Sequence, residues 1–163
     1  MEIRLVRPEE YDRAGRLVLA AYRALPGQHL SVGYADELAA VDRRALEADV
    51  LVAVADDVVG CATFVPDGSS PWAELLEGDE AGLRMLAVDP ACQGRGVGAA
   101  LLDACIDRAR ARSRSALFLH STPLMLAAHH LYERAGFVRV PDRDWTPEPD
   151  VPLWAFRLEL AQP

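Results

Sequence analysis

Three glycines, Gly94, Gly96 and Gly98, lie in the stretch QGRGVGA, directly before a helical pattern. The first N–H groups of a helix lack an intrahelical partner, and the helix dipole makes this end partly positive. Glycines remove the Cβ atoms that would keep a phosphate away, so the stretch predicts an anion site made of backbone N–H groups. Arg95 adds a permanent charge. The alternative is a turn that needs glycine only for its dihedral angles. One glycine would suffice for that turn, and three favour a ligand.

Two classes of phosphate ligand compete for this turn. The letters GRGVGA satisfy the dinucleotide fingerprint, which should begin where a strand ends and precede an acidic residue by about 20 positions. Here DPACQ separates the apolar strand from the first glycine. The next strand carries His120 and Ser121 near its end instead of an acid. We therefore favour the other class, whose motif starts at Gln93.

Two blocks of sequence carry a family resemblance. Gln93 to Gly98 matches the pattern Q/R-x-x-G-x-G/A, and the apolar strand MLAV stands before it. The stretch AAHHLYERAGF, Ala127 to Phe137, matches A-x-x-L-Y-E-x-x-G-F after one intervening helix and strand. Together they closely resemble the acetyl-CoA motif and the later helix of the GNAT superfamily of N-acetyltransferases, and the likeness extends over nearly the whole chain.

The resemblance implies where acetyl-CoA, the co-substrate, would bind. In such proteins the strand before the turn splays from its neighbour at a bulge, and its backbone bonds to the pantetheine arm. The diphosphate lies over the turn, and a strand N–H near Leu86 polarises the thioester carbonyl. The implied cofactor-binding residues are Leu86, Ala87, Val88, Gln93, Gly94, Arg95, Gly96, Val97, Gly98 and Ala99. The reaction needs no metal.

The resemblance also implies two proton-transfer groups. Tyr132 stands where related enzymes commonly keep a tyrosine that protonates the departing CoA thiolate; the alternative is a packing role on an amphipathic helix. For the base, several relatives carry a Glu where this chain has Gly82. Glu80 lies two residues earlier, on the same face of a strand, and is our candidate base. The alternative is that Glu80 belongs to a solvated acidic loop.

Two further positions near the expected site leave alternatives open. Met125 replaces an Asn that often helps to hold the cofactor, so that contact is absent or is supplied by Ser121 or Thr122. His120, at a strand end, either assists proton transfer or serves ordinary packing.

The surrounding pattern predicts the elements that position these residues. An alternating segment, EIRLVR, is followed by a helix from Pro8, a second helix through Leu38 and Ala45, and a hairpin that turns at Asp56 and Asp57. A loop then leads to a strand over 83–88, a helix over 97–112, the strand ALFLHST and a helix that stops at Gly136. A short strand, a proline-rich loop and a final strand, LWAFRLEL, complete the order. We expect one domain over 1–163, of the α/β (α+β) class, with a mixed, mostly antiparallel sheet flanked by helices.

Composition limits the function classes. The net charge of −8 argues against a nucleic-acid partner and suits a small cationic amine as acceptor. All seventeen basic residues are arginines, which excludes every mechanism that needs a lysine. No apolar run reaches the roughly 20 residues of a membrane span, and three cysteines without metal-site spacing suggest the cytoplasm.

We therefore expect an enzyme that acetylates a primary amine, the alternative being a catalytically silent acyl-CoA-binding module. The loop from Asp142 to Trp145 is expected to form a stiff lid or the contact of a homodimer.

Overall fold

One eight-stranded sheet organises residues 1–161, which the computed structural model describes. Its order is β1-β2-β3-β4-β5-β8-β6, with β7 paired to β8, and only β4 and β5 run parallel. The strands are β1 (Glu2–Leu5), β2 (Asp49–Val54), β3 (Val58–Val65), β4 (Glu80–Val88), β5 (Ala116–Ser121), β6 (Val138–Arg139), β7 (Trp145–Glu148) and β8 (Val151–Glu159). The helices are α1 (Tyr11–Arg23), α2 (Val32–Ala39), α3 (Val41–Glu47), α4 (Val97–Ala111) and α5 (Leu126–Ala135), with 3₁₀ turns η1 (Pro8–Glu10), η2 (Pro90–Cys92) and η3 (Pro141–Arg143).

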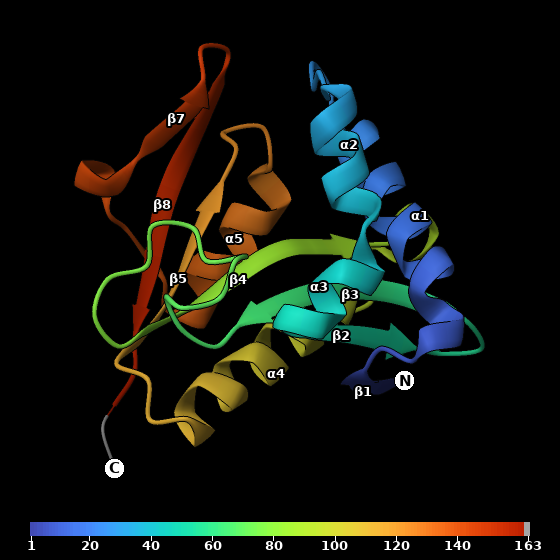
Figure 1. Cartoon of the computed structure of the whole chain (residues 1–163), viewed down its shortest axis with the longest axis horizontal. Helices are drawn as coiled ribbons and strands as arrows, with labels where there is room; N and C mark the ends of the chain where they lie inside the picture. The colour runs from blue at the N-terminus through green and yellow to red at the C-terminus, as the bar shows by residue number, and fades with distance from the viewer. Residues whose placement is uncertain (162–163) are drawn as a thin grey trace.

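The helices form a layer on each face of the sheet (Figure 1). One core cluster joins α1, α2 and α3 to β2, β3 and β4, with Leu17 and Leu38 among its buried side chains. The other joins α4 and α5 to the opposite side chains of the same strands and to β5 and β8, with Leu101 and Phe156 buried. Strand side chains alternate between the two faces, so both clusters draw on the same strands. The expected flanked mixed sheet is confirmed.

The sheet opens at its parallel strand pair. β4 and β5 pair only from Glu80 to Gly82 opposite Ala116 to Phe118, and no further pairing joins them in the described chain. The register of β4 against β3 shifts between Arg84 and Ala87, and Met85 inside this bulge has a φ of 56°. A left-handed conformation is sparsely populated by residues other than glycine and often marks functional sites. The predicted splay is therefore present.

Three predicted boundaries were wrong. β4 begins at Glu80 rather than at residue 83, because residues 80–82 pair with Ala116–Phe118 of β5. The second predicted helix is two helices, α2 and α3, which meet at Ala40 with a non-helical ψ of 56°. The proline-rich loop contains β7, which forms a hairpin with β8.

Candidate active site

The glycine-rich turn leaves a row of backbone donors free. Gly96 is the N-cap of α4 and has no side chain with which to cap it. Within residues 1–161, no protein acceptor takes a hydrogen bond from the N–H groups of Gln93 to Ala99; the first donor of the helix to find a partner is Ala100, whose N–H bonds to the Gly96 carbonyl at 3.0 Å. These N–H groups at the positive end of a 15-residue helix form a site for an anion.

The glycines of the turn meet two separate needs. Gly94 and Gly96 have φ values of 76° and 80°, where other residues are strained. A Cβ atom on either would have no neighbouring heavy atom within 4 Å, so the space over both is open to a ligand. Gly98 instead lies in the helix, where a Cβ would come to 3.3 Å from Leu131 Cδ2 of α5. The need for a positive φ thus explains Gly94 and Gly96 by itself. The open space beside both residues is a separate observation, and it favours a ligand there.

A groove of about 460 Å³, here called the cofactor groove, runs along this turn. It lies between the end of β4, the start of α4, the start of α5 and the end of α1. Arg134, Tyr22 and Met125, which sequence reasoning did not assign to the cofactor, also line it. Nine of the ten predicted cofactor-binding residues line it, Arg95 being the exception: Leu86, Ala87, Val88, Gln93, Gly94, Gly96, Val97, Gly98 and Ala99.

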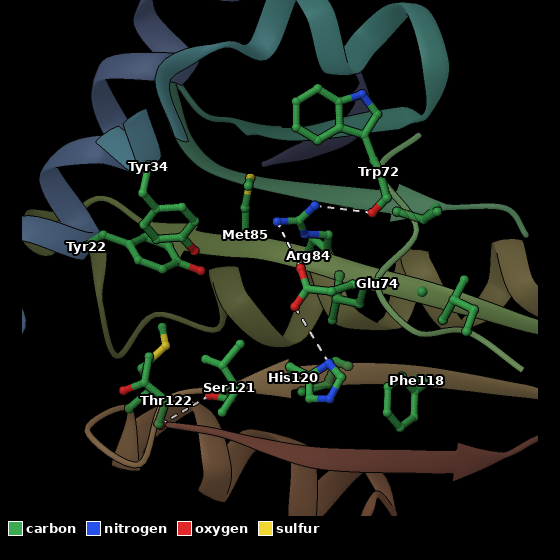
Figure 2. A pocket seen from close by; sticks show the side chains of 17 residues that line it. Tyr22, Tyr34, Trp72, Glu74, Arg84, Met85, Phe118, His120, Ser121 and Thr122 are labelled. Atoms are coloured by element: carbon green, nitrogen blue, oxygen red, sulfur yellow. Dashed lines mark hydrogen bonds and ion pairs between the residues drawn. The ribbon is translucent and has the colours of Figure 1, made fainter. Parts of the chain in front are cut away.

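Two more cavities continue from the cofactor groove. The central pocket, about 50 Å³, lies where β4 and β5 diverge and shares Tyr22 and Met125 with the groove (Figure 2). The outer pocket, about 320 Å³, shares Glu74 and Arg84 with the central pocket. Its other walls come from α2, the segment before it, and the β7–β8 hairpin, which stand at the same end of the molecule in Figure 1. The three cavities therefore adjoin one another through shared wall residues across the splayed strands.

The central pocket contains a polar chain of three side chains. Figure 2 shows Glu74 between Arg84 and His120. Arg84 Nη2 lies 2.9 Å from Glu74 Oε2, and Arg84 Nη1 donates to the Trp72 carbonyl at 3.2 Å. His120 Nδ1 lies 3.6 Å from Glu74 Oε1. Sequence reasoning missed Glu74 altogether, because it sits in a loop without a regular pattern.

Tyr132 is buried on α5, with 4 % of its surface exposed. Its ring packs against Phe137 and Phe156, with centroids 5.6 and 5.7 Å away. Burial raises the pKa of the Tyr132 hydroxyl, so the group stays protonated at neutral pH. The side chain lies beneath the groove rather than in its wall, in the same apolar cluster as Leu86.

Glu80 is held by ion pairs. Its carboxylate accepts from Arg143 at 2.7 and 2.9 Å, from Arg157 at 3.1 Å and from the Glu77 N–H at 3.1 Å. Burial acts to raise the pKa of Glu80, but these hydrogen bonds outweigh it and leave the pKa lowered. Glu80 is only 4 % exposed and lines none of the three cavities. The solvated acidic loop proposed as the alternative is present at Glu77 and Asp79, which are exposed, but Glu80 itself is buried in ion pairs.

The predicted substitutes for the Asn contact do not line the cofactor groove. Ser121 Oγ and the Thr122 carbonyl lie 3.2 and 3.0 Å from His129 Nε2 instead. Burial lowers the pKa of His129, whose ring stacks on Trp154, so this histidine is a neutral packing residue. Met125 itself lies in the wall shared by groove and central pocket.

Comparison with known proteins identifies the family. The family model described as "Acetyltransferase (GNAT) family" matches residues 17–137. The chain belongs to the GNAT family. This GNAT chain is 33% identical over 93 residues to N-acetylaspartate synthetase of Danio rerio, covering 48% of the chain and 33% of that protein. It is 41% identical over 73 residues to [ribosomal protein bS18]-alanine N-acetyltransferase of Haemophilus ducreyi, covering 44% of the chain and 50% of that protein.

A solved structure with the same fold carries a ligand. The Salmonella typhimurium protein yncA, solved with its cofactor acetyl-CoA, superposes on the GNAT chain with a TM-score of 0.71 and 23% identity, covering 99% of this chain and 95% of that one. The chain spans half or less of the length of the curated relatives it matches. Within residues 1–161, no helix is both long and apolar enough to cross a bilayer.

Proposed function

We propose that this protein transfers the acetyl group of acetyl-CoA directly to a primary amine of a small molecule. One observation carries the proposal: a row of N–H groups without protein partners in residues 1–161, Gln93 to Ala99, faces a groove that shares wall residues with a separate pocket where β4 and β5 diverge. The groove has room and donors for a phosphate-bearing cofactor. The pockets beyond it offer an acceptor a place of its own.

Each part of the cofactor meets a different group of the chain. The N–H groups of the turn bind the diphosphate, and Arg134 in the groove wall adds a cation beside it. The free edge of β4 after Gly82 bonds to the pantetheine arm, as an added strand would. An N–H near Leu86 donates to the thioester carbonyl and stabilises the oxyanion formed when the amine attacks.

The leaving group needs a proton when the tetrahedral intermediate collapses. The carbon–sulfur bond breaks, its electron pair stays on sulfur, and the Tyr132 hydroxyl donates the proton that completes the CoA thiol. The proton lost by the new amide nitrogen restores Tyr132. A positioned acid of this kind is worth about 10²–10⁴-fold in rate.

The outer pocket favours a cationic acceptor. Its wall contains three carboxylates, Glu37, Glu74 and Glu148, against one guanidinium, Arg84. An excess of acid attracts an ammonium and disfavours an acidic acceptor. The net charge of −8 acts in the same direction over a longer range.

Direct transfer needs no cysteine intermediate. Cys61 and Cys105 are fully buried, and burial raises the pKa of each to about 12, so both remain unreactive thiols. Cys92 in η2 lines the groove beside the turn and serves as part of its wall.

The alternative function is a catalytically silent acyl-CoA-binding module, which Gly82 and Met125 favour, because relatives carry Glu and Asn at these positions. Thiol release from acetyl-CoA, measured against a panel of amines, amino acids and peptides, separates the two functions. We expect turnover with small cationic amines and initial-rate lines that intersect, as for a ternary complex. Tight acetyl-CoA binding without turnover for any acceptor would establish the module instead.

A further inference from the structure

His120 has a buried nitrogen without a partner. Its side chain is 2 % exposed, and Nε2 lies 3.0 Å from the Arg143 carbonyl oxygen. A carbonyl only accepts, so Nε2 must carry the hydrogen of this bond. In the neutral ring, Nδ1 is then a bare acceptor, and it is sealed from solvent with no hydrogen-bond partner in the described chain. A buried acceptor of this kind destabilises the fold unless a ligand or a water molecule donates a hydrogen bond to it.

The atom facing this nitrogen is also an acceptor. Glu74 Oε1 lies 3.6 Å from His120 Nδ1, while Oε2 of the same carboxylate is bound by Arg84 at 2.9 Å. Two acceptors that face each other repel, and a group with at least two hydrogens resolves this by donating to both. A primary ammonium has three donors. A nitrogen about 2.9 Å from each acceptor can bridge two atoms that lie 3.6 Å apart.

The surroundings admit such a head group. The central pocket measures about 50 Å³, more than the roughly 10–15 Å³ that one water molecule needs. Glu74 also lines the outer pocket, through which the rest of the acceptor would extend. Tyr22 and Met125 form the wall toward the cofactor groove, where the thioester would lie.

Building on the proposed function, we propose that Glu74 and His120 together bind the ammonium group of the acceptor and that His120 is the base that activates it. The acceptor class is therefore an aliphatic primary amine that enters as its ammonium ion. Glu74 fixes the cation, and Arg84 fixes Glu74.

The proton step leaves charges balanced. An N–H bond of the ammonium breaks, its electron pair stays on nitrogen, and the proton moves to Nδ1 of His120. The resulting imidazolium still donates through Nε2 to the Arg143 carbonyl, and the Glu74 carboxylate beside it stabilises its charge. The neutral amine attacks the thioester, and His120 later releases its proton to solvent.

The charged groups around His120 come from three other segments. Glu74 approaches from the β3–β4 loop, Arg84 from β4, and Arg143 and Asp144 from η3 and its end. Arg143 stacks on Phe118, whose ring in turn meets His120 edge-on. Arg143 is paired with Glu80, Asp144 with Arg139 and Arg84 with Glu74, so each of these charges has an opposite partner.

The test compares His120→Asn and Glu74→Gln with the controls His130→Asn and Glu133→Gln, whose parent residues are exposed on α5. At pH 7, with the best amine of the panel, we expect His120→Asn to lower kcat by about 10²–10⁴-fold. Glu74→Gln should raise the KM of the amine by about tenfold or more. The KM of acetyl-CoA should change less than twofold in both, and the controls should match the wild type.

The pH dependence distinguishes a base from a structural residue. Near pH 10 roughly a third of an alkylamine is already deprotonated without help, against less than about 0.1 % at pH 7, since its pKa is about 10.4. The ratio of wild-type kcat to the kcat of His120→Asn should therefore fall toward one as the pH approaches 10. A deficit that is equal at pH 7 and pH 10, or no deficit at all, would overturn the role of His120.

Failure of the inference and failure of the proposed function look different. A wild-type protein that acetylates no amine would refute the proposed function itself. An active wild type whose Glu74→Gln variant keeps the amine KM would overturn the ammonium site alone. Thermal unfolding checks that each variant is folded, and Glu74→Gln, on a partly exposed loop side chain, tests the site even if His120→Asn is unstable.

Discussion

At the scale of single residues, the hydroxyl of Tyr132 combines burial with the absence of a protein partner. No hydrogen bond to it occurs in residues 1–161, and the ring alone accounts for its packing against Phe137 and Phe156. Because burial raises its pKa, the hydroxyl is fully protonated before the reaction. A thiolate is a weaker base than a tyrosinate, so the proton transfer depends on the proton that the new amide nitrogen returns to Tyr132. The packing role and the acid role therefore belong to different atoms of one side chain and can be separated.

Tyr132→Phe makes that separation. The ring contacts remain, so we expect the free energy of unfolding to change by less than about 1 kcal/mol. Loss of the donor should lower kcat by about 10²–10⁴-fold with little change in the KM of acetyl-CoA. Steady-state kinetics and urea unfolding measure both quantities, with Tyr11→Phe, on α1 and outside the three cavities, as the control. If Tyr132→Phe kept the wild-type kcat, Tyr132 would have a packing role and would not be the acid.

At the scale of elements, α2 depends on an arginine that belongs to α3. Arg44 is fully buried, and its guanidinium donates to the carbonyls of Glu37 and Leu38 at the end of α2 and to Thr63 Oγ1 of β3. Burial lowers the pKa of Arg44, and no carboxylate lies within ion-pair distance of it in residues 1–161. Its hydrogen bonds end α2 and hold that helix over the outer pocket.

We expect Arg44→Met to be destabilising, because it removes the arginine donors to the Leu38 carbonyl and Thr63 Oγ1 and leaves the Glu37 carbonyl with the Ala40 N–H alone. At about 1–3 kcal/mol for an unsatisfied buried group, the free energy of unfolding should fall by about 2–4 kcal/mol. Arg43→Met, the exposed neighbour on the same helix, should change it by less than about 0.5 kcal/mol. Urea unfolding of both variants is the measurement; equal effects would mean that the buried hydrogen bonds contribute nothing.

Local patterns predicted the elements well and long-range contacts poorly. The turn from Gln93 to Ala99 and the helix after it depend on neighbouring residues, and the structure has both; the splay of β4 was expected from the family resemblance and is also present. The ion pairs of Glu80 could not be predicted, since its partners Arg143 and Arg157 are 63 and 77 residues away. Glu74 and His120 likewise meet only because the loop before β4 folds back over β5.

At the scale of the whole molecule, three cavities lie in a row across the splayed sheet. Tyr22 and Met125 separate the cofactor groove from the central pocket, and Glu74 and Arg84 separate the central pocket from the outer one. The helices contribute to different ends: α4, α5 and the end of α1 to the groove, and α2 to the outer pocket. This arrangement lets two substrates bind at once from opposite sides, provided that the cofactor occupies the groove as proposed.

The claim that cofactor phosphates bind to main-chain N–H groups is tested most directly by NMR of the unaltered protein, because side chains at Gly94 or Gly96 would strain the turn itself. Backbone ¹H–¹⁵N signals are followed during titration with coenzyme A and, separately, with pantetheine, which lacks the diphosphate. We predict large downfield shifts for the N–H groups of Gly94 to Ala99 with coenzyme A, and much smaller shifts there with pantetheine. Saturable binding of coenzyme A that leaves these signals unmoved would contradict the account.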